Sequence, residues 1–278
     1  MNRLISIELQ KIWKNKASRV LTLTYFILLS FIALIASIKF DIGVFKFHLA
    51  EMGIFNFPFI WHFNTYIAAW LKFFLAIVIV SMMANEYSYG TLKQNLIDGL
   101  SKKEFILSKF LTVVVFALCS TIFVFVMSLI LGLCFSSYNE FGIIFTDLDY
   151  LLAFFVKLTG FFSFCLFLGI LVKRSAFALG FLLVWFFVES IIKGILVFQI
   201  FPESETGHYI TQFLPLEAMS NLISNPIPRL SVVKNIGNQI GIDTNVDYSV
   251  QYLPILIVLI WTFIFVYSSY KLLKNRDL

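Results

Sequence analysis

Long apolar runs alternate with short polar segments along the whole chain. Six runs are long enough to cross about 30 Å of hydrocarbon at about 1.5 Å per helical residue. They occupy residues 20–38, 60–84, 108–135, 150–172, 176–198 and 252–273. Only Lys173, Arg174 and Ser175 separate the fourth run from the fifth, which predicts a tight turn between antiparallel helices. The pattern predicts an all-α polytopic membrane protein with six transmembrane helices.

Composition supports this class. The chain is 60% hydrophobic and 13% charged, and it contains 34 Phe. A soluble domain of this length could not cover so much apolar surface with so few charges. We therefore expect one membrane domain over residues 1–278, with residues 199–251 as a small extracytoplasmic cap. Within the cap, residues 214–224 suit a short helix that has Pro215 in its first turn.

The positive charges predict an orientation. An even number of spans places both termini on one side, and 14 of the 21 Lys and Arg residues fall on that side. Four lie opposite: Lys39, Lys46, Arg229 and Lys234. Because loops rich in Lys and Arg stay in the cytoplasm, we expect both termini to be cytoplasmic. The net charge of +5 then reflects topology and contact with anionic lipids, and nucleic acid is not an expected partner.

Residues 1–17 form a patterned segment before the first run. Leu4, Ile5, Leu9, Ile12 and Trp13 fall on one half of a helical wheel, and Arg3, Gln10, Lys11 and Lys14 fall largely on the other. This pattern predicts a helix lying in the membrane interface, with its basic side toward head groups or a partner. Glu8 and Lys16 depart from the pattern because they lie nearer the apolar half. The alternative is an ordinary basic flank.

A polar stretch, residues 86–104, separates the second and third runs. Two capping-box spacings occur there in succession, Thr91 with Gln94 and Ser101 with Glu104. Gly90 precedes the first of them, and Gly99 stands where a left-handed residue would close a helix after Asp98. We expect a short helix over residues 92–98, held against the membrane between two spans. Such a protruding helix suits the docking of a soluble protein.

Apart from Lys109 and Lys271, which lie near span ends, four charged residues lie inside the predicted spans: Lys72, Lys157, Glu189 and Lys193. A central Lys costs about 2.5–3.5 kcal/mol on insertion, so these residues invite an explanation. Glu189 and Lys193 have the favourable order for an intrahelical pair. One hypothesis is that the four line a polar pathway or a subunit seam. The alternative is pairing within the bundle, or extension of Lys157 and Lys193 to the outer surface.

Several catalytic motifs are absent from the sequence. It contains no G-x-x-x-x-G-K-[ST] phosphate loop, no H-E-x-x-H zinc motif and no G-x-S-x-G nucleophile elbow. The three histidines, His48, His62 and His208, are scattered. We therefore expect no catalytic, cofactor-binding or metal-binding residue in this chain, and no enzyme activity of its own.

The polar stretch resembles a family motif. Glu86-Tyr87, Gly90-Thr91-Leu92, Ser101-Lys102, Phe105 and Lys109 are similar to the pattern E-Y-x-x-G-T-L…S-[RK]-x-x-[FI]…K of permease subunits of type-2 ATP-binding-cassette (ABC-2) exporters. The opening Glu8-Leu9-x-Lys11 with Lys14 and Arg19 is similar to that family's E-x-x-K…R segment. Leu214-Pro215-Leu216-Glu217-Ala218 is similar to its extracellular piece before the last span. Lys72 and Lys157 have no counterpart in the family pattern.

The resemblance implies a machine with separate parts. Two permease chains, as a homodimer or with a related chain, would form an exporting core among the lipids of a bacterial cytoplasmic membrane. A separate ABC ATPase would bind ATP and Mg²⁺, and this chain would bind no cofactor. The implied coupling residues are Glu86, Tyr87, Gly90, Thr91, Leu92, Gln94, Leu96, Ile97, Asp98 and Gly99. The implied residues of the adjoining interfacial helix are Glu8, Lys11, Trp13 and Lys14.

Two other functions stay open. One is a stand-alone secondary transporter or channel that uses Lys72, Glu189 and Lys193 as a relay. The other is a membrane enzyme acting on lipids, which would need a nucleophile or metal cluster that the sequence does not reveal.

Overall fold

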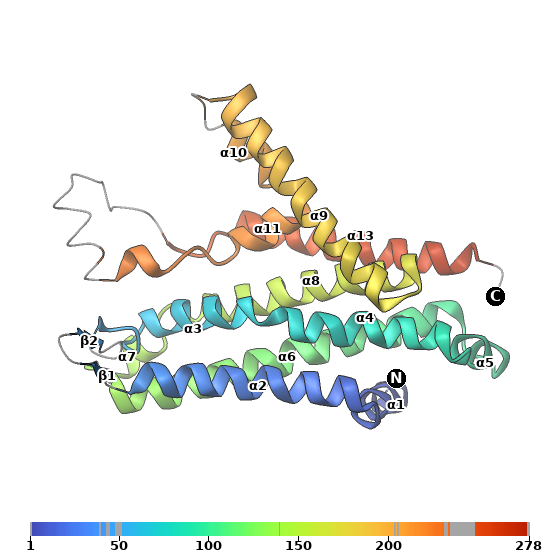
Figure 1. The fold of residues 1–278 in the computed structure, drawn as a ribbon, viewed down its shortest axis with the longest axis horizontal. Helices are drawn as coiled ribbons and strands as arrows, with labels where there is room; N and C mark the ends of the chain where they lie inside the picture. The colour runs from blue at the N-terminus through green and yellow to red at the C-terminus, as the bar shows by residue number, and fades with distance from the viewer. Residues whose placement is uncertain are drawn as a thin grey trace.

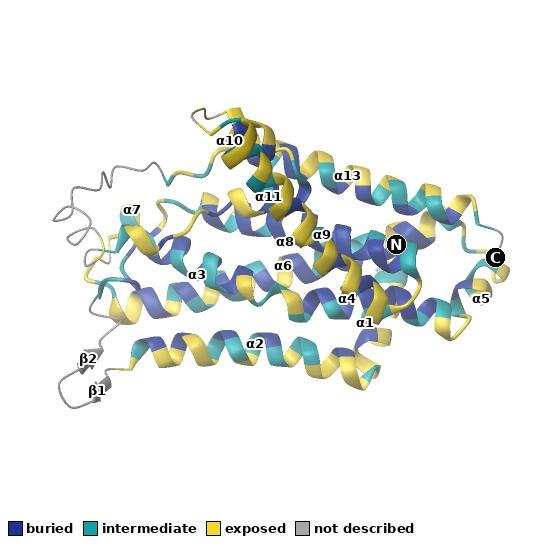
Figure 2. Cartoon of the chain, turned by 45° about the horizontal axis from the view of Figure 1, so that its top comes forward, coloured by how far each residue is buried: buried dark blue, intermediate teal, exposed yellow. Residues whose placement is uncertain are grey.

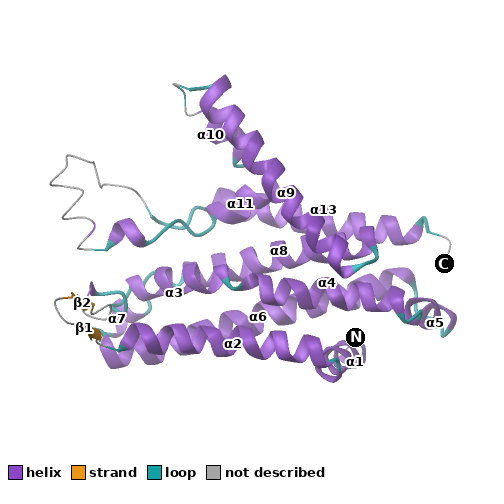
Figure 3. Cartoon of the chain, in the orientation of Figure 1, coloured by secondary structure: helices purple, strands orange, loops and turns teal. Residues whose placement is uncertain are grey.

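The computed structural model describes residues 2–38, 40–42, 45–47, 52–138, 140–202, 204, 206–230, 233 and 248–276. Over these residues the fold is a helical bundle with one small hairpin (Figure 3). The hairpin pairs β1 (Phe40–Ile42) with β2 (Phe45–Phe47) in antiparallel register, with Phe40 opposite Phe47. Lys39 and Lys234, two predicted outer charges, lie outside the described residues, as do parts of the predicted cap and the side chain of Lys46.

The helices follow the predicted runs in order. They are α1 (Asn2–Lys14), α2 (Lys16–Ser37), α3 (Phe59–Trp70), α4 (Lys72–Ser88), α5 (Thr91–Ile97), α6 (Lys102–Phe135), α7 (Phe141–Ile144), α8 (Asp149–Val172), α9 (Ser175–Ile195) with the π-helical turn η2 (Leu196–Ile200), α10 (Thr206–Thr211), α11 (Pro215–Asn221), the 3-10 turn η3 (Ile227–Arg229) and α13 (Tyr252–Lys274). The turn between α8 and α9 is confirmed, because Lys173 adopts φ 64° and α9 begins two residues later. The short cap helix is confirmed as α11, with Pro215 at its first position.

Five helical segments of the described chain are long and apolar enough to cross a membrane, and the bent pair α3–α4 makes a sixth when the two helices are counted as one span. In lipid every backbone amide must be satisfied within its own segment, so runs of this length fold as helices. The chain is therefore an α-helical, multi-pass membrane protein.

The second span is not the continuous helix that residues 60–84 predict. It breaks at Leu71 and bends by 46° between α3 and α4. At the break, the Leu71 amide bonds to the Ala68 carbonyl and the Phe74 amide bonds to the Leu71 carbonyl, each spanning three residues. Neither proline nor glycine occurs there, so the sequence carries none of the usual signals for a kink. The bend places Lys72 at the first position of α4.

Helix α8 is the centre of the bundle and α9 is its most peripheral span. In the most apolar stretch of each span, 78% of the residues are buried in the span containing α8, but only 11% in the span containing α9. Helix α9 crosses the bundle obliquely and projects from it together with α10 (Figure 1). The exposed surface of α9 is clear in Figure 2. Its side chains are largely apolar, as expected where a surface faces lipid or another apolar chain.

Helix α8 approaches α4 closely at Gly169. A Cβ atom there would lie 2.9 Å from Met83 Cβ and 3.4 Å from the Val80 carbonyl oxygen. Small residues at such crossings allow the backbones of membrane helices to pack. We expect Gly169→Val to lower the stability in detergent by about 1–3 kcal/mol through overpacking. Thermal unfolding checks this, with Gly180→Val as control because nothing lies within 4 Å of Gly180; an equal loss in both variants would contradict the prediction.

One end of the bundle gathers most of the basic segments. The α1–α2 junction, α5, the start of α6, the α8–α9 turn and the end of α13 all lie there (Figure 1), and we call it the α5 end. Lys102 Nζ donates to the Lys274 carbonyl at 3.2 Å, which ties the start of α6 to the end of α13. The grouping agrees with the predicted set of like-sided charges. The assignment of this end to the cytoplasm stays a prediction.

Candidate functional site

The α5 end presents a short helix between two spans. Gly90 adopts φ 68°, a left-handed conformation that favours glycine, and it reverses the chain between α4 and α5. Gly99, at φ 97°, performs the same role after α5, as predicted. The expected helix over residues 92–98 is therefore present as Thr91–Ile97. We call residues 89–99 the knuckle.

The two predicted capping boxes have different outcomes. Ser101 and Glu104 form a complete capping box at the start of α6. The box predicted from Thr91 and Gln94 is wrong, because α5 begins with Gly90 at its N-cap and has no side-chain cap. Thr91 Oγ1 instead donates to Glu86 Oε2 at 2.5 Å. The Glu86 carboxylate, near the end of α4, thus accepts a hydrogen bond from the hydroxyl that would otherwise have capped α5.

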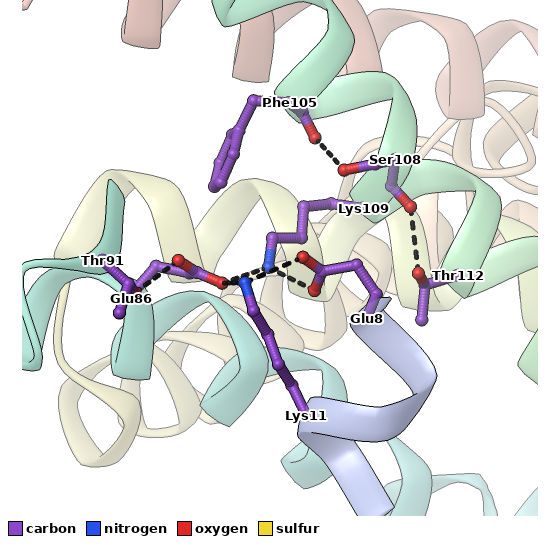
Figure 4. A network of polar contacts seen from close by, with 8 residues as sticks. All are labelled: Glu8, Lys11, Glu86, Thr91, Phe105, Ser108, Lys109 and Thr112. Atoms are coloured by element: carbon purple, nitrogen blue, oxygen red, sulfur yellow. Dashed lines mark hydrogen bonds and ion pairs between the residues drawn. The ribbon is translucent and has the colours of Figure 1, made fainter. Parts of the chain in front are cut away.

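Glu86 belongs to a group of four charges, three of them buried, which is shown in Figure 4. Lys109 Nζ lies 2.6 Å from Glu86 Oε1 and 2.5 Å from Glu8 Oε2. Lys11 Nζ lies 2.9 Å from Glu86 Oε1 and 3.2 Å from Glu8 Oε1. We call Glu8, Lys11, Glu86 and Lys109 the ion-pair cluster. It joins α1, α4 and α6, and Thr91 extends it to α5.

The ion-pair cluster is neutral and largely buried. The side chain of Lys109 is 0% exposed, that of Glu86 4% and that of Glu8 6%, whereas Lys11 is 39% exposed. Burial opposes the charge on Lys11, but the carboxylates of Glu8 and Glu86 outweigh it and hold the Lys11 pKa above its usual value. Two cations therefore balance two anions. Removing any one of the three buried members would leave an uncompensated charge in an apolar setting.

The end of the chain fastens the neighbouring helices. Arg276 donates to the Ile170 carbonyl at 2.6 Å and to the Leu171 carbonyl at 3.0 Å, in the last turn of α8. It also donates to the hydroxyl of Tyr87 at 3.2 Å. These carbonyls lack partners within their own helix, so the guanidinium satisfies them. The base of the knuckle is therefore held by α1, α6, α8 and the chain end together.

The knuckle, which contains most of the predicted coupling residues, has an inner and an outer face. Leu92 is 2% exposed and Leu96 packs partly against the core. Tyr89 and Ile97 are 74% and 83% exposed. Also exposed are Lys93, Gln94, Asp98 and Gly99. The outer face therefore combines two large apolar side chains with polar ones, and only this face is open to a partner.

Helix α1 is shorter than residues 1–17, because it ends at Lys14 and Asn15 caps the start of α2. Ile12 is buried, while Trp13 is 53% exposed and Lys14 is exposed. The position of Glu8 on the apolar side is explained by its contact with Lys109. Contact of the exposed side with lipid head groups stays a prediction.

The four charged residues of the spans do not share one network. Lys72 and Lys157 line a cavity of about 330 Å³. Lys193 pairs with Glu217 of α11 at 2.6 Å. Glu189 accepts from Trp185 Nε1 at 2.5 Å and from the Leu216 and Glu217 amides at 3.0 and 3.2 Å. The predicted Glu189–Lys193 pair is therefore wrong, because α11 supplies a different partner to each residue. A relay through Lys72, Glu189 and Lys193 has no continuous contacts among the described residues.

Sequence reasoning missed the role of Lys109 and Glu8. The sequence predicts no partner for Lys109, the last residue of the family motif, yet this residue is fully buried. A signal was present, since Lys109 falls four residues after Phe105 and four before Val113, on the buried stripe of α6. Glu8 likewise stands four residues before buried Ile12. A positive charge on the apolar stripe of one helix and a negative charge on that of another are complementary when the two stripes pack together.

Comparison with known proteins places the chain within a family. Residues 25–278 match the family described as "Protein of unknown function (DUF2705)", and the chain belongs to it. A segment of 62 residues is 37% identical to the uncharacterized protein YhcI of Bacillus subtilis (strain 168). That match spans 22% of this chain and 20% of the relative, so it covers about a fifth of either protein.

Proposed function

We propose that this chain is the permease subunit of an ABC exporter, with α5 as the coupling helix that receives a separate ATPase. One observation carries the proposal: an exposed, partly apolar knuckle is tied to three helices by buried charges. Ile97 is 83% exposed at its tip, whereas Lys109 is 0% exposed at its base. A surface helix with no mechanical role has little need of such an anchor.

The anchor also supplies a route for force. Thr91 at the start of α5 bonds to Glu86, and Glu86 contacts Lys109 on α6 and Lys11 on α1. A displacement of the knuckle would therefore be passed to α4, α6 and α1 together. In the proposed machine, ATP and Mg²⁺ bind to the ATPase, and its closure moves the knuckle of each permease in a dimeric core.

Sidedness follows from the same end of the bundle. Lys93, Lys102, Lys103, Lys173 and Arg174 lie there with the last residues of α13. Under the positive-inside rule this end faces the cytoplasm, where ATP is available. The proposed location is a bacterial cytoplasmic membrane, with lipid and a second permease chain as neighbours.

The decisive experiment is co-purification of this chain with the ABC ATPases of its own organism, co-expressed one at a time. We expect the wild-type chain to retain the ATPase and Ile97→Asp to lose it, because the substitution places a charge in a docking surface without touching the buried core. Ile97 is a better target than Leu92, whose 2% exposure means that a charge there would disrupt the knuckle itself.

The matched control is Phe141→Asp, an apolar-to-acid change at a residue 81% exposed on α7, away from the α5 end. It should leave the association intact, and both variants should melt like the wild type in detergent. Retention of the ATPase by Ile97→Asp would count against the proposal. So would labelling of Ile97→Cys by an impermeant maleimide added to intact cells, where the labelling exceeds that of the wild type through its own exposed cysteines, Cys119 and Cys134.

A further inference from the structure

A cavity of about 330 Å³ lies beside the break in the second span. The α3–α4 break, α8, α9 and α11 all contribute to its lining. This volume falls at the small end of the range for ligand sites, which is enough for a head group and the first part of a chain. Among its lining residues are Lys72, Phe73, Lys157, Phe161, Phe186 and Ser220.

Two cations in this cavity have no acidic partner among the described residues. Lys157 is 5% exposed, and the hydrogen bond of its Nζ goes to the Ser220 carbonyl at a long 3.4 Å. Lys72 Nζ lies 4.3 Å from the centroid of the Phe161 ring. Burying one ammonium is costly, and two in one cavity also repel each other. A bound anion would remove both penalties.

The rim of the cavity is apolar and faces outward. Trp70 is 66% exposed, and Leu183 and Phe186 on α9 are each 54% exposed. These residues belong to segments that are long and apolar enough to cross a membrane, so their exposed faces are open to hydrocarbon or to another apolar chain. An occupant with a charged head and an apolar body would place the head at the two lysines and the body along this rim. A small hydrophilic anion would gain nothing from the rim.

We propose that this cavity binds the anionic head group, a phosphate or carboxylate, of a membrane amphiphile. Lys72 and Lys157 hold the head group, while Phe73 and Phe186 contact the adjoining apolar part of the amphiphile. This site is separate from the ion-pair cluster at the α5 end. Its occupancy requires no ATPase, so the binding proposal and the permease proposal can fail independently.

The test uses the purified full-length chain in maltoside detergent, without an ATPase. Phosphatidylglycerol is the anionic probe and phosphatidylcholine the zwitterionic one, with retained lipid measured by native mass spectrometry. We expect selective retention of phosphatidylglycerol, weakened at least tenfold in K72M/K157M. Met keeps the length of the side chain without its charge. The control K193M should bind like the wild type, because Lys193 pairs with Glu217 and does not line this cavity.

Equal retention of phosphatidylglycerol by the wild type and K72M/K157M would overturn the proposal. If soluble glycerol 3-phosphate competes for the cavity with the same affinity as the lipid, the requirement for an amphiphile is overturned. The acyl chains of the lipid would then contribute nothing to binding. Folding of the variants is checked by thermal unfolding without added lipid, where loss of two uncompensated cations should not lower the midpoint. If the double variant does not fold, K72M alone decides, since Lys72 is only partly buried.

Discussion

Replacement of Lys109 by Met is expected to destabilise the protein by about 3–5 kcal/mol, the usual cost of breaking a buried ion pair from one side. Lys109 contacts Glu8 and Glu86 at 2.5 and 2.6 Å and is itself 0% exposed. Its loss leaves two buried carboxylates facing Lys11 alone. The measurement is reversible unfolding in mixed detergent, with Lys103→Met as the control because Lys103 is exposed at the same end.

A second substitution separates charge balance from packing. Glu8→Gln combined with Lys109→Met removes one charge of each sign and leaves Lys11 paired with Glu86 at 2.9 Å. We expect the double variant to regain a large part of the lost stability, since neighbouring residues in one network do not behave additively. If Lys109→Met is as stable as Lys103→Met, the ion-pair cluster does not hold the knuckle.

This cluster also shows where sequence reasoning ends. Ser101 and Glu104 are three residues apart, so their capping box depends on local geometry alone and was predictable. Glu8 and Lys109 are 101 residues apart in sequence, and the contact exists only because α1 folds back against α6. The same long-range contact explains the failed box at Thr91, whose hydroxyl is taken by Glu86. Local sequence signals predict a helix cap correctly unless a side chain distant in sequence forms a hydrogen bond with the capping group.

The spans obey a similar distinction. Runs of about 20 apolar residues must become helices in lipid, so their existence follows from the sequence. The 46° break at Leu71 does not, because no proline or glycine marks it. Nor could composition show that α8 is central and α9 peripheral, since both runs are equally apolar in appearance. Their positions depend on packing contacts such as that of Gly169 with Met83.

Helix α11 depends on α9 for its N-terminal cap. Glu189 is therefore the second position at which we expect a substitution to lower the stability strongly. No side chain of α11 itself caps its first turn. The Glu189 carboxylate instead accepts from the Leu216 amide at 3.0 Å and from the Glu217 amide at 3.2 Å. Trp185 Nε1 donates to the same group at 2.5 Å. A negative charge at these amides also complements the partial positive charge of the helix start.

Replacement of Glu189 by Ala is therefore expected to cost about 2–3 kcal/mol, in the range of hydrogen bonds to a charged group. Hydrogen–deuterium exchange should accelerate at the amides of Leu216 and Glu217, and Trp185 fluorescence should change. Glu189→Gln keeps an acceptor oxygen and should fall between Ala and the wild type. The control is Ser190→Ala, because Ser190 is exposed and its hydroxyl bonds within α9. Unchanged exchange at both amides in Glu189→Ala would show that α11 is held by packing alone.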